Sequence, residues 1–260
     1  MVTMKELCGY LETLAPSALA EDYDNVGLLI GDQKAEISKI LISLDTDESV
    51  VREAERVGAD LVLSHHPLLF HPLKQIVRQD AVGNTVIKLI QSGINLYAMH
   101  TNFDSVKNGL CDYFLKTICN AEASQSMEGE FPDGIGRITE LPEKIMLSDL
   151  LAMFKERLHM EHIRFVGDEN QTISKLAVCN GGGADLVYDA YRLGADVYIS
   201  GDFKYHHARH AYETGKALIE VPHYEAEILF CDYMAEILQK HFGQKCEVFV
   251  YKNENPWKNI

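Results

Sequence analysis

Residues 60–67 read Asp60-Leu61-Val62-Leu63-Ser64-His65-His66-Pro67, an apolar run of strand type that ends in two adjacent histidines. Ligands of α/β proteins bind where strands end, because the connecting loops open there onto a crevice. Side chains alternate along a strand, so His65 and His66 converge on one centre only if the strand bends. Otherwise they serve two metal ions about 3.5–4 Å apart. The plain structural alternative is a turn or helix cap ahead of Pro67.

Two further strand-like runs are followed by residues of metal-binding type. These runs cover residues 94–99 and 217–221, and the residues that follow them are His100, Asp104, His223 and Glu227. His223 and Glu227 are four positions apart, which places both on one face of a helix that begins near Pro222. One such pair is common on solvated helices, but three strand-end clusters together predict a metal site.

The composition predicts a soluble, cytoplasmic protein with a sizeable core. Of the 260 residues 47% are hydrophobic, and no apolar run approaches the length of about 18 residues that a membrane span needs. The first 14 residues predict an amphipathic helix and lack the pattern of a signal peptide. The six cysteines lie in apolar segments without C-x-x-C spacing, as in a reducing compartment. The net charge of −15 argues against bulk nucleic-acid binding, although a metal centre can still attract a small anionic substrate.

Short apolar runs alternate with amphipathic stretches, which predicts an α/β fold with mixed, largely parallel sheets. The expected strands cover residues 28–30, 38–44, 60–64, 94–99, 162–166, 176–179, 197–200, 217–221 and 246–251. The expected helices cover residues 1–14, 48–57, 82–91, 108–119, 147–158, 184–193, 205–214 and 224–242. The alternation weakens between residues 121 and 142, where we expect a change of domain. No repeat of fixed period is evident.

The histidines and carboxylates of the three clusters form a mixed ligand set. Imidazole and carboxylate together suit divalent zinc, iron, manganese or cobalt. One ion rarely takes five protein ligands and keeps room for substrate, whereas two ions share them and generate hydroxide for hydrolysis. We therefore expect two ions per chain, bound by His65, His66, Asp104, His223 and Glu227. His100 is a further ligand, a partner of a ligand, or a general acid or base.

Other polar segments have both a functional and a plain structural interpretation. The Gly181–Gly183 loop precedes an expected helix and forms either a tight turn or a phosphate-binding loop. Asp202 is a candidate helix N-cap. Of the histidines within residues 206–210, we expect His206 to face the metal site. The acidic run at residues 21–24 is typical of a solvated turn.

Five of these segments occur in the order seen in one protein family. They are Tyr-Asp-Asn-Val-Gly-Leu at 23–28, Ser-His-His-Pro-Leu-Leu-Phe at 64–70, His-Thr-Asn-Phe-Asp at 100–104, Gly-Asp-Phe-Lys-Tyr-His at 201–206 and His-Tyr-Glu-Ala-Glu at 223–227. Over nearly its whole length the chain resembles the type 2 GTP cyclohydrolase I family, also called Nif-three-like dinuclear-metal-centre hexameric proteins. Tyr23, Pro222 and Ala226 depart from residues frequent in that family, and none of these departures removes a ligand.

The resemblance implies two interlocked α/β lobes with the metal pair in the cleft between them. We expect residues 1–120 plus 223–260 to form the first lobe and residues 121–222 the second, without the inserted middle domain of longer relatives. The resemblance also implies a toroidal homohexamer, the five metal ligands named above, and His100 and His206 as catalytic residues in the same cavity.

The activity implied by the resemblance is metal-dependent hydrolysis that opens the purine ring of GTP, a small anionic nucleotide. Two alternatives remain. The same centre would also serve a metallo-phosphoesterase or nucleotide hydrolase, or the protein is a non-enzymatic hexamer whose metals are structural or regulatory. The products separate the two enzymes, because ring opening releases formate and phosphoester cleavage releases phosphate or a monoester.

Overall fold

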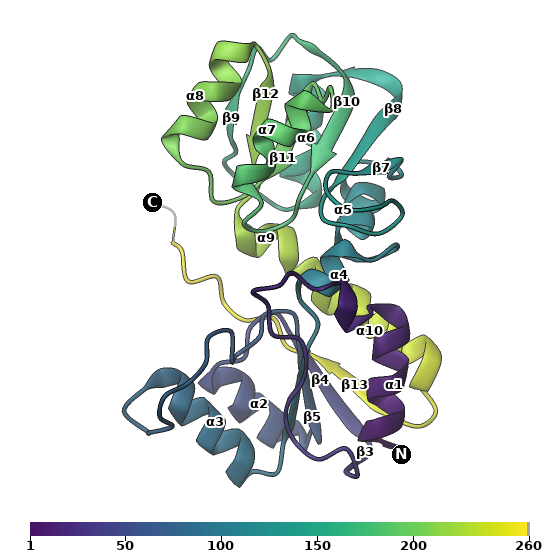
Figure 1. Ribbon diagram of the computed structural model, residues 1–260, viewed down its shortest axis with the longest axis vertical. Coiled ribbons are helices and arrows are strands. Elements are labelled where there is room, and N and C mark those ends of the chain that lie inside the picture. The colour runs from purple at the N-terminus through teal and green to yellow at the C-terminus, as the bar shows by residue number, and fades with distance from the viewer. Residues whose placement is uncertain (259–260) are drawn as a thin grey trace. The chain divides into compact units, whose positions relative to one another are not determined.

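The computed structural model describes residues 1–258 and divides into two compact units (Figure 1). The first unit comprises Met1–Phe103 and Phe230–Ile260, and the second comprises Asp104–Leu229. Each unit has helices packed on a mixed sheet, which confirms the predicted α/β class. Within the described residues, no helix has the length and apolar character that crossing a membrane requires.

A five-stranded sheet organises the first unit, in the order β13-β4-β5-β6-β2. Its strands are β2 (Gly27–Ile30), β4 (Lys39–Ser43), β5 (Leu61–Ser64), β6 (Asn95–Ala98) and β13 (Glu247–Val250). All neighbours are parallel except β2, which is antiparallel to β6. A separate antiparallel pair joins β1 (Val2–Thr3) to β3 (Glu36–Ile37). Because Ser64 pairs with Ala98, the carboxyl ends of β5 and β6 lie side by side.

Helices cover both faces of this sheet (Figure 1). On one face, α2 (Glu48–Val57) and α3 (Ala81–Gln91) pack through apolar residues against β4, β5 and β6. On the opposite face lie α1 (Met4–Leu14) and α10 (Leu229–Phe242). The bounds of α2 match the sequence prediction, because Asp47 accepts hydrogen bonds from its first turn and Gly58 ends it at a φ of 68°.

A six-stranded sheet organises the second unit, in the order β7-β8-β10-β11-β12-β9. Its strands are β7 (Gln125–Ser126), β8 (Arg137–Met146), β9 (Arg164–Val166), β10 (Thr172–Val178), β11 (Val197–Ser200) and β12 (Ala217–Glu220). The strands β10, β11 and β12 are parallel to one another, and the other pairings are antiparallel.

The helices of the second unit also lie on both faces of its sheet. One apolar core contains α5 (Leu110–Ile118) and α6 (Leu147–Arg157), and the other contains residues of α7 (Val187–Arg192) and α8 (Tyr205–Thr214). Alternate residues of β10 and β11 face the two cores, as the strand period requires. The short helical segments are η1 (Ser17–Leu19), η2 (Ala184–Leu186), α4 (Thr101–Ser105) and α9 (His223–Glu227).

The two units share a structural motif that is not apparent as a fixed period in the sequence. Asp60 accepts hydrogen bonds from the backbone N–H groups of the Ser-Lys pair at 38–39, and Asp196 accepts them from the Ser-Lys pair at 174–175. In each unit, the last of three consecutive parallel strands leads into a five-residue helix, α4 or α9. The helix α4 carries the candidate ligand Asp104, and α9 carries Glu227. Both halves of the chain therefore place an acidic candidate ligand on a short helix after a parallel strand.

Arg137 ties the start of β8 to the segment that follows α4. The residue is fully buried, and its Nε donates to Asp112 Oδ1 at 2.7 Å. Its Nη2 donates to the carbonyl oxygens of Ser105 at 3.0 Å and Val106 at 2.9 Å, and its Nη1 donates to two carbonyls of the preceding loop. These bonds fix the backbone directly after Asp104.

Three regions differ from the sequence expectations. The helix expected over residues 224–242 is interrupted at Ile228 and forms α9 and α10. The weakly patterned region 121–142 contains β7 and the start of β8, which is stabilised by its long antiparallel pairing with β10. The helix α5 packs with α6 in a core of the second unit. The boundaries between the units therefore fall at 103/104 and 229/230, whereas the sequence predicted them near 121 and 222.

Candidate metal-binding site

Three histidines of the first unit gather at the carboxyl ends of β5 and β6. His65 and His66 follow β5, and His100 follows β6. Each offers one ring nitrogen, and these three atoms lie within 4.8 Å of one another. The ring centroid of His65 is 5.2 Å from that of His66 and 5.3 Å from that of His100. Because Ser64 pairs with Ala98 in the parallel register, the histidines that follow the two strands form one cluster.

The chain bends where β5 ends, which resolves how two adjacent histidines reach the same cluster. The strand stops at Ser64, and the Ser64 hydroxyl donates to the carbonyl oxygen of His66 at 2.8 Å. The backbone N–H of His66 still donates to the Leu44 carbonyl at 2.9 Å, which anchors the turn to β4. The rings are consequently tilted by 40° to each other instead of lying on opposite faces of the sheet.

The Nδ1 atom of each clustered histidine is bonded to an oxygen within the same unit. The distances are 2.7 Å from His65 to the Met99 carbonyl, 2.8 Å from His66 to Asp45 and 2.9 Å from His100 to Asp24. A carbonyl or carboxylate only accepts hydrogen bonds, so Nδ1 donates and Nε2 is the nitrogen that would bind an ion. Histidine ligands of metals usually have such an outer partner, which orients the ring and fixes its tautomer.

Asp24 is held in its charged form, although the sequence places it in an acidic run typical of a solvated turn. Its side chain is fully shielded from solvent. Burial by itself would raise the pKa of Asp24, but hydrogen bonds from His100, Thr101 and the Asn25 N–H outweigh it and lower the pKa to about 2. The carboxylate is therefore charged at neutral pH and stabilises a proton on Nδ1 of His100.

Replacing Asp24 by Ala is expected to weaken divalent-metal binding by about 10–100-fold, the usual effect of losing the outer partner of a ligand. The affinity is measured by competition with a chromophoric chelator. Asp22→Ala is the matched control, because Asp22 belongs to the same acidic run but is exposed. Equal affinities of the two variants would contradict a positioning role for Asp24.

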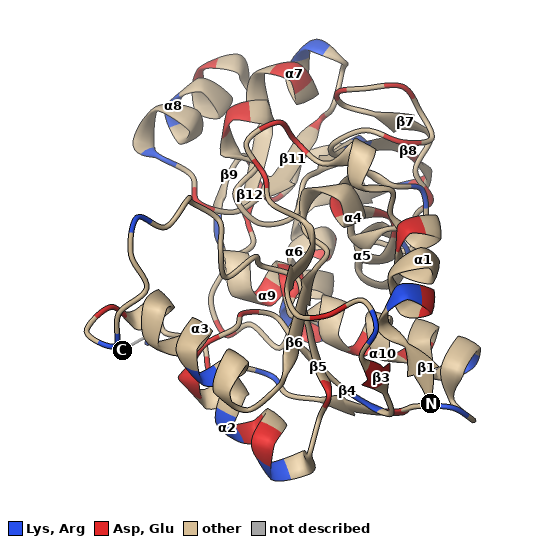
Figure 2. Ribbon diagram, turned by 60° about the horizontal axis from the view of Figure 1, so that its bottom comes forward, with Lys and Arg blue, Asp and Glu red and all other residues tan. Residues whose placement is uncertain are grey.

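Three candidate ligands of the second unit lie on α4 and α9. His223 Nε2 is 2.9 Å from Glu227 Oε2, across one turn of α9, whose acidic residues are red in Figure 2. A carboxylate oxygen of Asp104 lies within 4.8 Å of one of Glu227, and both residues are buried. His223 Nδ1 is 2.8 Å from Asp202 Oδ2, so this histidine has the same kind of outer partner as the three of the first unit.

The glycine loop at 181–183 packs directly against these ligands. Gly181 has a φ of +61°, and a Cβ there would lie 2.0 Å from Glu227 Oε1 and 3.0 Å from His223 Nε2. A Cβ on Gly183 would lie 2.6 Å from the Sγ of Cys179. Close packing in a tight turn explains these glycines, and a phosphate-binding role of the loop stays a prediction.

The donor atoms fit a divalent ion of the predicted kind. Two ligands that each lie about 2.0–2.2 Å from one ion are separated by about 3–3.5 Å, so the 2.9 Å between His223 Nε2 and Glu227 Oε2 would widen slightly around an ion. The set combines imidazole nitrogens with carboxylate oxygens, the mixture that zinc, iron, manganese and cobalt accept. The histidines of the first unit and the acidic set of the second are each assembled within their own unit.

His206 lies in another histidine group of the second unit. It is exposed in the first turn of α8, and ligand atoms of His206, His207 and Asp185 lie within 4.8 Å of one another. His207 is buried, accepts a hydrogen bond from the Lys204 N–H at Nδ1 and contacts Asp185 at 3.1 Å through Nε2. Burial, the largest effect, lowers the pKa of His207, so this ring is a neutral structural group. The catalytic role of His206 stays a prediction.

Two carboxylates that hold candidate ligands occupy the same position relative to a strand. Asp45 follows β4 by two residues, and Asp202 follows β11 by two residues. Asp202 is not the N-cap of α8, because that position is Lys204. Each of these aspartates follows an apolar strand, and the neighbouring strand of the sheet is followed by a histidine. This pattern is the signal that could have identified Asp45 and Asp202.

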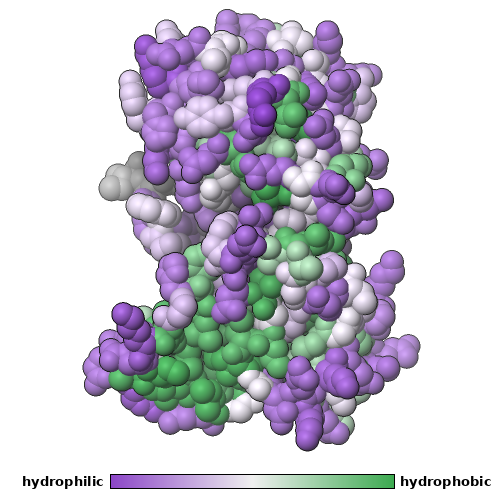
Figure 3. Space-filling model, in the orientation of Figure 1, coloured by the Kyte–Doolittle hydropathy of each residue, from purple (hydrophilic) through white to green (hydrophobic). Residues whose placement is uncertain are grey.

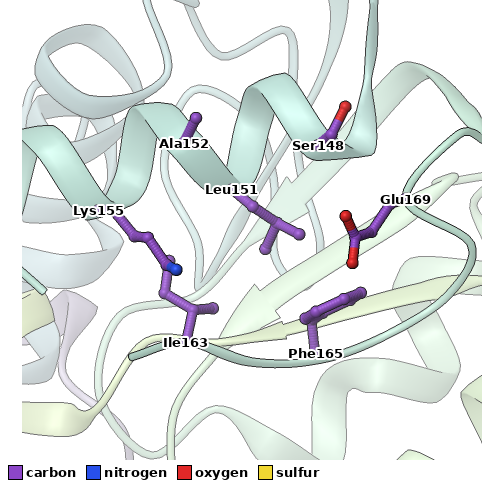
Figure 4. Close-up of a pocket in the computed structure, with 7 residues that line it drawn as sticks. All are labelled: Ser148, Leu151, Ala152, Lys155, Ile163, Phe165 and Glu169. Carbon is purple, nitrogen blue, oxygen red and sulfur yellow. The ribbon is translucent and has the colours of Figure 1, made fainter. Parts of the chain in front are cut away.

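A cavity of about 210 Å³ lies between α6 and the edge strand β9 of the second unit (Figure 4). Figure 4 shows Leu151, Ile163 and Phe165 between Lys155 and Glu169. None of its lining residues is a candidate ligand, so this cavity does not belong to the site.

Comparison with known proteins agrees with the fold. A protein from Clostridium perfringens named GTP cyclohydrolase 1 type 2 homolog is 36% identical over 99% of both chains. A Methanocaldococcus jannaschii protein of the same name is 34% identical over 91% of this chain and 95% of its own. Among solved structures, a hypothetical protein from Staphylococcus aureus superposes with a TM-score of 0.88 at 29% identity, covering 99% of both chains. HcgD from M. jannaschii superposes with a TM-score of 0.82 at 31% identity, covering 96% of this chain and 97% of its own.

The family model described as Duf34/NIF3 (NGG1p interacting factor 3) matches residues 2–256. This match covers nearly the whole chain and agrees with the resemblance seen in the five sequence segments. The chain therefore belongs to the Duf34/NIF3 family.

Proposed function

We propose that this chain is a metal-dependent hydrolase with a dinuclear centre whose ligands come from both units. The observation that carries the proposal is the common setting of four histidines, each with Nδ1 held by a carbonyl or carboxylate oxygen. Such a contact orients a metal ligand and raises its basicity. The proposed ligands are His65, His66, Asp104, His223 and Glu227, with His100 beside them.

The path of the chain supports one shared centre instead of two separate sites. The chain passes between the units after Phe103 and again after Leu229. Asp104 directly follows the first crossing and is one helical turn from His100, and Glu227 lies two residues before the second crossing. Each crossing is thus beside a proposed ligand, so the two ligand sets are joined by short, ordered segments.

Bound as a pair, divalent ions supply Lewis-acid activation of water near neutral pH. His100 is the one histidine of the cluster outside the five proposed ligands, so its Nε2 is left to move a proton in that reaction. Asp24 stabilises a proton on its Nδ1, so Nε2 accepts a proton as a general base and returns it as an acid. Asp104 and Glu227 would bind as anions and offset part of the charge of the ions.

GTP is the substrate that we propose, because the curated relatives carry the name GTP cyclohydrolase 1 type 2 homolog. One water opens the five-membered ring of guanine at C8 and leaves this carbon as a formamide, and a second water releases it as formate. Water attacks C8, and the departing ring nitrogen must be protonated, which matches a base that later acts as an acid.

Metal content measured by plasma mass spectrometry tests the centre. We expect about two ions per wild-type chain and about one or fewer in Asp104→Ala. Asp149→Ala is the matched control, since Asp149 is an exposed aspartate of the same unit and is expected to leave the content unchanged. A formate-release assay with GTP, run on protein loaded with each candidate ion, tests the reaction.

Each outcome is decisive for one part of the proposal. Absence of stoichiometric metal after reloading would overturn the centre. Two ions with phosphate or a monoester as product would replace the cyclohydrolase by a phosphoesterase. Two ions with no turnover of GTP or of a phosphoester panel would identify a non-enzymatic metal protein.

A further inference from the structure

An aromatic cavity of the first unit adjoins the histidine cluster. Its volume is about 470 Å³, within the range of small-molecule sites. Its lining includes Tyr23, Phe70, His71 and Ile76, which supply aromatic and aliphatic surface. Asp24 is also among the lining residues, and its shielded carboxylate holds Nδ1 of His100, so one residue joins the cavity to the cluster.

A row of aromatic rings leads from this cavity to His100. Phe70 lies edge-to-face with Tyr23 at a centroid distance of 6.2 Å and edge-to-face with His100 at 6.1 Å. It also contacts His71 at 4.8 Å. The side chain of Asn25 donates to the Leu69 carbonyl at 2.6 Å, which fastens the segment that carries Phe70 to the segment that carries Tyr23. The ring surface of the cavity is therefore set in place relative to His100.

We propose that this cavity binds the flat heterocyclic base of the substrate beside Phe70, whose ring contacts that of His100. The inference rests on the proposed function, because His100 acts there on a substrate ring. Aromatic faces bind planar bases by stacking, and such contacts tolerate the identity of the base. The substrate class is thus a nucleoside or nucleotide, recognised at this cavity through its base.

The charge of the cavity indicates which part of a nucleotide it takes. Among the described residues that line it, none is a lysine or an arginine. The carboxylate of Asp24, which is bonded to His100 and to the Thr101 N–H, lies beside the cavity. A phosphate would be repelled here, whereas an uncharged ring would not. The phosphate tail of a nucleotide must therefore lie outside this cavity.

The rim of the cavity is unusually apolar for an exposed surface. The exposed fraction is 52% for Ile76 and 39% for Leu73, and Ile90 on the neighbouring α3 is 61% exposed. Figure 3 shows hydrophobic residues gathered over this part of the first unit, where α3 lies. Of these three, Ile76 and Leu73 line the cavity and Ile90 does not. This difference provides a matched pair of variants.

Binding of guanosine, which has the base but no phosphate, to metal-stripped protein tests the proposal by calorimetry. We expect Ile76→Asp and Tyr23→Ala to weaken guanosine binding about tenfold or more, and Ile90→Asp to change it less than twofold. Ribose 5-phosphate, which has no base, is expected not to compete. The oligomeric state of every variant is measured by light scattering.

Three results would overturn the proposal: no binding of guanosine to the wild type, unchanged binding in both cavity variants, or an equal loss in Ile90→Asp. A change of oligomeric state with unchanged guanosine affinity would assign the apolar rim to a protein contact. Failure of the proposed function looks different, because guanosine would still bind through the cavity while GTP released no formate. Conversely, GTP turnover with the same KM in Ile76→Asp would keep the function and reject the cavity.

Discussion

Arg137→Met is expected to lower the free energy of unfolding by about 3–5 kcal/mol, as removal of one partner of a buried ion pair does. The change leaves Asp112 without its 2.7 Å partner and removes the donor from the carbonyls of Ser105 and Val106. Because these carbonyls directly follow Asp104, metal binding by the same variant should also weaken. Urea unfolding measures the stability, and plasma mass spectrometry measures the metal content.

Arg164→Met is the control for that substitution. Arg164 is also a strand residue of the second sheet and pairs with Glu220 at 2.8 Å, but its side chain is 80% exposed. Exposed ion pairs contribute about 0–1 kcal/mol, so this variant should unfold almost as the wild type does. Similar losses in the two variants would show that burial of Arg137 is not what makes it stabilising.

Gly181→Ala is expected to destabilise the protein by about 2–5 kcal/mol and to reduce metal binding at His223 and Glu227. Two costs add up: an L-residue in the left-handed region costs about 1–2 kcal/mol, and overpacking costs about 1–3 kcal/mol. The second cost arises because the new Cβ would lie 2.0 Å from Glu227 Oε1, so the buried carboxylate must move. Unfolding in urea and metal content per chain are the measurements.

Gly215→Ala separates the two costs. Gly215 has a φ of +65°, close to the +61° of Gly181, but no atom lies within 4 Å of the Cβ position. This variant should therefore lose only the conformational part, about 1–2 kcal/mol, and retain its metal. Wild-type metal content in Gly181→Ala would show that the glycine loop does not hold the ligands in place.

Most element positions follow from local signals in the sequence. The helix α2 could be placed because Asp47 caps one end and Gly58 ends the other, and both signals act over a few residues. The region that forms β7 and β8 could not be placed, since its strand conformation depends on pairing with β10, which lies further along the chain. The interruption of the last long helix at Ile228 likewise has no local proline or glycine to announce it.

The sequence alone determined the α/β class, the family and the segments that carry the candidate ligands. These follow from the period at which apolar residues recur and from the order of the motifs, and both are properties of the sequence itself. Only the tertiary structure decided how these residues are held. His100 and Asp24 are 76 positions apart, and His223 and Asp202 are 21 apart, so the hydrogen bonds between them exist only after the strands have paired. The packing of Gly181 against Glu227 likewise depends on a loop and a helix that are separate in sequence. Contacts between distant segments have no local sequence period, and they orient the ligands of the candidate site.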